Sequence, residues 1–273
     1  MRSAESLAAV LLAFALCAAG PSHAGAEAVR QEAIARLKLQ MPEVPVANYG
    51  LGAAAFDLAP GGVADGAATA IVEEGRRLWQ KKFRNGKSLG SCFPNGGRRI
   101  AGTFPQFDAR LKKVVTLETA INQCLLLNKE PPFDPADART MGAALAWLRA
   151  QSDGMKIAVR VASPAAEQRF ESGRELFFMR TGQQNLACAS CHLKSAGRVY
   201  GDSAILPAVG LAAQWPAIRG GQPVTITGRI RDCLARMGAA PVNFSAEDFA
   251  HVEFFLAYLS NGYPVKANVN RSD

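Results

Sequence analysis

The chain contains one phrase twice. VTLETAINQCL occupies residues 115–125 and VTITGRIRDCL occupies residues 224–234. Both copies keep a Val, a Thr, an Ile, a Cys and a final Leu at the same positions, whereas Arg229 of the second copy stands where the first has Ala120. A repeat of this kind predicts two structural units of the same type, one after the other. The 273 residues, 49% of them hydrophobic, are enough for two domains of roughly 100 residues each.

Further matches extend the repeat toward the N-terminus. EGRRLW at residues 74–79 resembles SGRELF at residues 172–177, and each phrase is typical of a helix that opens its unit. In the second unit, Ser163 and Pro164 supply the N-cap and the first residue of this helix.

The last part of each unit has the pattern of an amphipathic helix. Residues 133–137 and 244–248 match as two helix starts with acidic residues in the first turn. Apolar residues then recur at helical spacing from Met141 and from Val252, and this alignment places His251 opposite Thr140. We interpret the apolar stripes as core packing.

The first 26 residues have the pattern of a secretory signal peptide. Arg2 is followed by an apolar run at residues 7–19 and by the small residues Ser22 and Ala24, and cleavage is expected after residue 24 or 26. A buried N-terminal helix is the alternative. The remaining chain keeps the net charge of +8, five cysteines and two histidines, and no later run is long enough to span a bilayer.

We therefore expect a soluble protein exported to the periplasm, which is an oxidising compartment. The positive charge suits acidic proteins or small anions as partners, and no nucleic-acid partner is expected.

Residues 188–192 read CASCH, the C-x-x-C-H pattern of covalent c-type haem attachment. Cys188 and Cys191 are about one helical turn apart, so both can form thioethers on one porphyrin edge while His192 reaches the iron. A redox dithiol or half of a zinc site is the alternative, but a second pair of close ligands and a thioredoxin-like βαβ pattern are missing from the sequence. Because the pattern occurs once, we expect one haem c.

The first unit carries LGSCF where the second carries CASCH. Cys92 matches the second cysteine of the motif, but Leu89 and Phe93 replace the other cysteine and the histidine, so this unit should hold no haem. Cys124 of the repeated phrase should point into the vacated space and reach Cys92. We expect a disulfide between these two cysteines, with two free thiols as the alternative.

A second axial ligand would come from Cys233, Met237 or His251, which all follow the motif. Methionine is the ordinary ligand of an electron-transfer cytochrome, whereas a thiolate lowers the potential. The repeat favours Cys233, since the expected disulfide leaves it as the unassigned cysteine at the matching inward position. Met237 is then core or pocket wall, and His251 is the main rival ligand.

Arg229 precedes Cys233 by four residues, so the two side chains share one face of a helix. An arginine in the haem unit that is alanine in the haemless unit is better explained by site chemistry than by folding. Its planar guanidinium suits a bidentate oxyanion, with a haem propionate or a surface carboxylate as the alternative partner. Arg231 and Arg236 lie on other faces and should be solvated.

The expected fold is all-α, and the order of its helices resembles two tandem class I cytochrome c domains, the first without haem. The boundaries are 1–26 for the signal peptide, 27–64 for an N-terminal extension, 65–152 for the haemless domain and 153–273 for the haem domain. Residues 151–162 read as a linker between the two domains.

With CASCH, the cysteine pair of the first unit and Arg229 ahead of Cys233, the chain resembles the A subunits of the SoxAX cytochromes of bacterial thiosulfate oxidation, in their one-haem form. The resemblance covers nearly the whole exported chain. It implies a heterodimer with a small haem-bearing X subunit and an L-cysteine S-thiosulfotransferase activity. This activity joins thiosulfate oxidatively to a cysteine of the SoxYZ carrier and passes two electrons to a downstream cytochrome c.

The same resemblance implies that Cys233 is the axial ligand opposite His192, as a thiolate or a persulfide, and that Arg229 holds the sulfonate end of thiosulfate. The alternative function is a plain electron-transfer cytochrome, which would need Met237 or His251 on the iron. A haem peroxidase subunit is a weaker alternative, because such dihaem enzymes need a second C-x-x-C-H.

Overall fold

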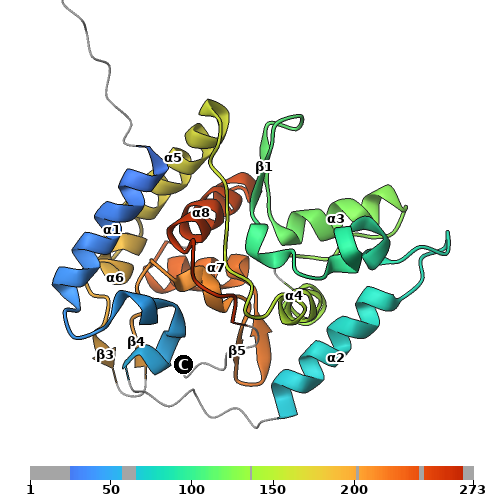
Figure 1. Ribbon diagram of the computed structural model, residues 1–273, viewed down its shortest axis with the longest axis horizontal. Helices are drawn as coiled ribbons and strands as arrows, with labels where there is room; N and C mark the ends of the chain where they lie inside the picture. The colour runs from blue at the N-terminus through green and yellow to red at the C-terminus, as the bar shows by residue number, and fades with distance from the viewer. Residues whose placement is uncertain (1–24, 57–65, 136, 201–202, 240–242, 267–273) are drawn as a thin grey trace, which may run out of the picture.

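The computed structural model describes residues 25–56, 66–135, 137–200, 203–239 and 243–266 (Figure 1). The expected signal peptide, apart from its last two residues, and the expected boundary at residue 64 lie outside this part. The helices and strands are α1 Ala26–Gln40, η1 Val46–Phe56, α2 Gly66–Gln80, η2 Leu89–Cys92, η3 Pro94–Gly97, η4 Ala101–Thr103, β1 Gln106–Asp108, β2 Lys113–Val115, α3 Leu117–Leu127, α4 Thr140–Ala150, α5 Pro164–Phe178, α6 Cys188–His192, β3 Val199–Tyr200, β4 Ser203–Ala204, η5 Leu211–Gln214, β5 Ala217–Arg219, β6 Gln222–Val224, α7 Ile226–Arg236 and α8 Ala246–Leu259.

Helices dominate, and they fall into two matched sets. We call the part with α2, α3 and α4 the first half and the part with α5 to α8 the second half; Figure 1 shows them next to each other. Each half has its own core, built around Trp79 in the first and around Phe170, Phe177 and Phe255 in the second. The Phe177 and Phe255 ring centroids are 5.2 Å apart, within the range of favourable aromatic pairs.

The opening and closing helices of each half cross at a matched glycine. A Cβ on Gly75 would collide with the carbonyl oxygen of Ala143, and a Cβ on Gly173 would collide with the carbonyl oxygen of His251. The structure therefore pairs His251 with Ala143. The sequence alignment, which placed His251 opposite Thr140, was wrong by about one helical turn, because apolar stripes repeat every turn and fit both registers.

The expected helix starts are correct except for one. Ser163 caps α5 by accepting a hydrogen bond from the Ala166 amide, and Ser245 caps α8 in the same way. The segment 133–137 was also expected to start a helix, but α4 begins only at Thr140. The Asp137 carboxylate accepts a 2.8 Å hydrogen bond from the Arg139 amide, which holds this segment in a turn.

The structure adds three two-stranded antiparallel hairpins to the helices, so the all-α prediction was incomplete. The hairpins β1–β2 and β5–β6 occupy matched places just before α3 and α7. Each packs against the closing helix of the opposite half: β2 contacts α8, and β6 contacts α4. Val114 of β2 is buried in the core of the second half, and Lys113 forms a 3.0 Å ion pair with Glu247. The two halves are thus interlocked.

Residues 151–162 do not form a free linker. Ile157 and Val159 are buried, and the Ile157 amide donates to the Tyr263 carbonyl at 2.9 Å. The next amide, of Ala158, donates to the Gly102 carbonyl of the first half at 2.7 Å. The segment is held by both halves because its backbone groups are buried and need partners.

The N-terminal extension packs on the second half. α1 covers its outer side (Figure 1), and Leu37 and Met41 are fully buried in the same core as Phe170. The Val46 carbonyl accepts a 2.6 Å hydrogen bond from the Tyr263 hydroxyl. In the part of the chain that the structure describes, no helix is both long and apolar enough to cross a membrane.

Candidate functional site

The CASCH residues form the short helix α6, which presents the two motif cysteines as free thiols. The Ser190 hydroxyl accepts a 3.1 Å hydrogen bond from the Ala187 amide and fixes the start of this helix. Cys188 and Cys191 are half-buried and unbonded. Their arrangement on one helical turn fits the attachment of two thioethers to a single porphyrin edge.

His192 is oriented by its backbone surroundings. Its Nδ1 lies 2.7 Å from the Leu206 carbonyl oxygen. Because a carbonyl oxygen can only accept, Nδ1 carries the proton of the neutral ring and Nε2 carries the lone pair. This is the tautomer that a metal-ligating histidine needs when it binds through Nε2.

Cys233 of α7 approaches the two motif cysteines. Burial, and then the nearby Cys233 thiol, raises the pKa of Cys188 to about 12, and the same two causes raise the pKa of Cys191. Cys233 is itself a half-buried free thiol. The structure thus brings together three of the residues that the sequence predicted: Cys188 and Cys191, which would attach a porphyrin, and Cys233. His192 directly follows Cys191 at the end of α6.

Arg229 lies one helical turn before Cys233, with part of its charge unsatisfied. Its Nη1 is buried and has no hydrogen-bond partner among the described residues, and no ion pair joins it to a described carboxylate. A buried guanidinium nitrogen without a partner is costly unless an anion binds it. This arrangement fits a bound anion at the site.

The rest of α7 positions these two residues. Thr225 caps the helix, and Ile226, Ile230 and Leu234 bury its inner stripe. Arg231 and Arg236 are exposed, as expected from their faces, although the Arg231 guanidinium also lies 5.2 Å from the Phe249 ring centroid. A rigid helix therefore carries Arg229 and Cys233.

In the first half, the corresponding space is filled by protein. Cys92 and Cys124 form a disulfide, in agreement with the sequence prediction. Leu89 is fully buried, and the buried Phe93 packs against Trp79 with ring centroids 5.1 Å apart. Leu89 and Phe93 hold the positions of Cys188 and His192. The side chains that would attach and ligate a haem are thus replaced by a disulfide and apolar packing.

The two rival ligands are placed differently from Cys233. Met237 is buried in the core at the end of α7, as a structural residue would be. His251 is buried near the α5 helix, and burial followed by the Arg169 charge lowers its pKa. None of the groups that act on His251 belongs to α6 or α7.

The sequence did not reveal a cluster of charged residues between the halves. Glu118, Glu253 and the fully buried Arg149 line one cavity there. Burial, followed by the charges of Glu253 and Asp153, which act in the opposite sense, lowers the pKa of Arg149 to about 10. The sequence did contain a sign of this cluster, because Glu253 interrupts a mostly apolar stretch of the closing helix.

Comparisons with known proteins identify the family of this chain. The family model described as SoxA/TsdA, cytochrome c domain, matches residues 74–157 and 172–265. The L-cysteine S-thiosulfotransferase subunit SoxA of Chlorobaculum thiosulfatiphilum is 38% identical over 202 residues, which cover 73% of this chain and 70% of that protein. The SoxA subunit of Allochromatium vinosum is 30% identical over 70% of this chain and 69% of that protein.

A solved structure extends the similarity to three dimensions. The crystal structure of SoxXA from P. pantotrophus superposes with a TM-score of 0.68 at 25% identity, and the match covers 76% of this chain and 80% of that chain. The family model matches one segment in each half, and the second segment contains the CASCH motif, Arg229 and Cys233. The chain therefore belongs to the SoxA/TsdA cytochrome c domain family and, within it, to the SoxA subunits of L-cysteine S-thiosulfotransferases of the Sox pathway.

Proposed function

We propose that this chain binds one haem c in its second half and uses Cys233 and Arg229 to couple thiosulfate to a cysteine of the SoxYZ carrier. Cys188 and Cys191 would form the thioethers, and His192 and Cys233 would hold the iron. A haem bound there supplies a one-electron acceptor next to Cys233. The first half supports a count of one haem, because its two cysteines are bonded to each other in a disulfide.

The observation that carries this proposal is the contrast between two matched cysteines. Cys124 is bonded to Cys92, whereas Cys233 remains a free thiol near Cys188 and Cys191. A plain electron carrier has no need of a free thiol beside its haem. A thiolate is a strong ligand for ferric iron and a nucleophile toward sulfur.

Arg229 positions the anionic substrate in this proposal. The buried Nη1 without a partner offers a charge-assisted hydrogen bond to a sulfonate oxygen of thiosulfate. The outer sulfur of thiosulfate is then held toward Cys233, which lies one turn further along the same helix. A bound anion also removes the cost of the unsatisfied guanidinium.

The overall reaction is balanced by an external acceptor. The S–H bond of the carrier cysteine breaks, a bond forms between its sulfur and the outer sulfur of thiosulfate, and one proton and two electrons are released. Two equivalents of oxidised cytochrome c accept the electrons. The residues of this chain bind the sulfonate and hold the reacting sulfur.

The relatives indicate the setting of this reaction. The similar crystal structure is of a SoxXA complex, so we propose a heterodimer with a small haem-bearing SoxX subunit. The signal-peptide pattern at residues 1–26 supports export to the periplasm. The net charge of +8 suits an acidic carrier or cytochrome partner.

A cysteine variant tests the proposal. In the purified heterodimer, Cys233→Ala is expected to change the low-spin ferric EPR spectrum and to abolish coupling of thiosulfate to the carrier. Met237→Leu is the matched control, because it alters a buried sulfur on the same helix and should leave both readouts near wild type. If Cys233→Ala retains spectrum and coupling while Met237→Leu changes them, the chain is a plain electron carrier and the proposal is wrong.

A further inference from the structure

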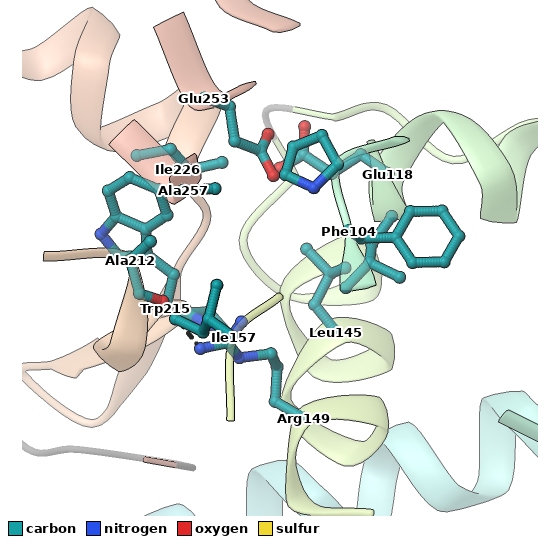
Figure 2. Close-up of a pocket in the computed structure, with 13 residues that line it drawn as sticks. Phe104, Glu118, Leu145, Arg149, Ile157, Ala212, Trp215, Ile226, Glu253 and Ala257 are labelled. Atoms are coloured by element: carbon teal, nitrogen blue, oxygen red, sulfur yellow. Dashed lines mark hydrogen bonds between the residues drawn. The ribbon is translucent and has the colours of Figure 1, made fainter. Parts of the chain in front are cut away.

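A small cavity lies between the two halves, away from the CASCH helix (Figure 2). Its volume is about 30 Å³, which is room for about two water molecules. Matched segments of both halves form its wall, with Phe104 and Pro105 from the first and Trp215 and Pro216 from the second. The cavity therefore belongs to the interface between the halves.

Two glutamates face this cavity from opposite halves. Glu118 begins α3 and Glu253 lies on α8; Figure 2 shows both at one end of the cavity and Arg149 at the other. The Glu118 side chain is buried, and its Oε1 has no hydrogen-bond partner among the described residues. Glu253 forms no ion pair and no hydrogen bond with any described side chain.

No described cation forms an ion pair with either glutamate, although the charge of Arg149 lowers the pKa of Glu253 and so offsets part of the effect of burial. The Arg149 guanidinium donates through Nη2 to the carbonyls of Ala212 and Ala213, at 2.8 and 2.9 Å, and forms no ion pair with either glutamate within the described chain. The charges of Glu253 and then Asp153 act on Arg149 and partly offset the lowering of its pKa by burial. Arg231 of α7, which is exposed, is the remaining cation that acts on Glu118. Glu118 is buried and Glu253 is half-buried beside it, so two negative charges at this place without a paired cation would be destabilising.

We propose that Glu118 and Glu253 form a proton-binding site, in which the two carboxyl groups and the water-sized cavity between the halves retain one proton near neutral pH. The ligand of this site is a proton from solvent, and no redox step is involved. The proposal does not depend on the haem assignment.

The pKa shifts of the two carboxyl groups agree with their position at the cavity. Burial raises the pKa of Glu118 to about 7, against the opposing hydrogen bonds from Thr227. Burial, and then the Glu118 charge, raises the pKa of Glu253 well above its ordinary value. Because each charge disfavours the other, the two carboxyl groups titrate as one pair.

The site is attached to the helix that carries the candidate catalytic residues. The Thr227 hydroxyl, in the first turn of α7, donates a 2.7 Å hydrogen bond to Glu118 Oε2. An ionised Glu118 favours the N-terminus of α7 through its charge and through this charge-assisted bond, whereas a neutral Glu118 does so less. Proton release should therefore tighten the first turn of α7, two residues ahead of Arg229.

Infrared spectroscopy of the holoprotein tests the proton. Wild type should show the C=O band of a protonated carboxylic acid at pH 6, and this band should disappear as the pH is raised. The Glu118→Gln/Glu253→Gln double variant should lack the band. Each single variant should titrate at a lower pH than wild type, because the repulsion within the pair is gone. Glu247→Gln, at an exposed glutamate paired with Lys113, is the control and should keep the wild-type band.

Hydrogen exchange tests the link to α7. The amides of the first turn of α7 should become several-fold more protected as the pair loses its proton, and this change should be absent in Glu118→Gln, whose amide oxygen still accepts from Thr227. A wild-type protein without the carboxylic acid band at pH 6 would overturn the proton site. A band that persists in the double variant would do so as well. If the exchange rates of the α7 amides in wild type do not depend on pH, the proposed link between the proton site and α7 is wrong.

Discussion

Cys124 and Cys233 occupy the same position of the equivalent helices α3 and α7, but only Cys124 is oxidised. Its partner Cys92 holds the place that Cys191 holds in α6. The first pair of matched positions is thus joined by a disulfide, whereas Cys191 and Cys233 are not bonded to each other. This difference supports our proposal that the second half alone binds haem.

The number of haems follows from this difference. We expect the mass of the exported protein to exceed that of its polypeptide by one covalently bound haem, located on the peptide that contains Cys188 and Cys191. Cys188→Ala should lose one thioether, whereas Leu89→Ala should leave the haem content unchanged. Mass spectrometry of intact protein and of its peptides is the measurement; a second haem on a peptide with Cys92 would contradict the assignment.

Arg229→Ala should lower turnover without changing the haem. Loss of a charge-assisted contact to an oxyanion costs about 1.5 to 3 kcal/mol, so kcat/KM for thiosulfate coupling should fall roughly tenfold to hundredfold. The visible and EPR spectra should stay near wild type, because Arg229 is not an iron ligand in the proposal.

Arg236→Ala is the matched control for this experiment, since it removes an exposed cation from the same helix. Its coupling rate should remain within about twofold of wild type, as expected for an exposed charge. Equal losses in the two variants would mean that Arg229 acts only through general surface charge.

The disulfide should stabilise the first half. Replacing both Cys92 and Cys124 by serine is expected to lower the free energy of unfolding by about 2 to 4 kcal/mol, through the loss of a cross-link that closes a loop. The haem spectrum should change little, because the second half has a separate core. Denaturant unfolding checks the stability, and peptide mapping without reduction checks the bond; a bond missing from the native protein would contradict the structure.

Features that depend on local sequence could be predicted. The N-cap Ser163, the single turn of CASCH and the cysteine pair of the first half follow from short-range patterns and from the repeat, and the structure contains each of them. Local chemistry decides these features, since a cap or a motif needs only a few neighbouring residues.

Features that depend on contacts between the halves could not be predicted. The hairpin that carries Val114 is stabilised by burial in the opposite half, and the segment with Ile157 is buried because both halves bind it. Glu118 lies in a phrase that reads as an ordinary helix start, and only the cavity shows that it is buried opposite Glu253. A single-sequence pattern contains no information about which distant surface covers a residue.

The helix crossings give the sharpest stability prediction, because the sign of the effect depends on position. Gly66 opens α2 with open space around a Cβ, whereas Gly75 of the same helix faces the Ala143 carbonyl and the Trp147 side chain. Alanine is favoured over glycine in a helix by up to about 1 kcal/mol, so Gly66→Ala should be neutral or stabilising. At Gly75, the added methyl must separate α2 from α4, and overpacking of this kind costs about 1 to 3 kcal/mol.

Gly173→Ala should repeat the Gly75→Ala result in the second half, where the added methyl meets the His251 carbonyl and Phe255. Thermal unfolding of the three variants measures the effect, with an expected fall in Tm of roughly 2 to 10 °C for the two crossing glycines and no fall for Gly66→Ala. Haem retention should suffer only in Gly173→Ala, since α5 and α8 enclose the core of the haem half. If both crossing variants unfold at the wild-type temperature, the close contact of the opening and closing helices does not contribute to the stability of each half.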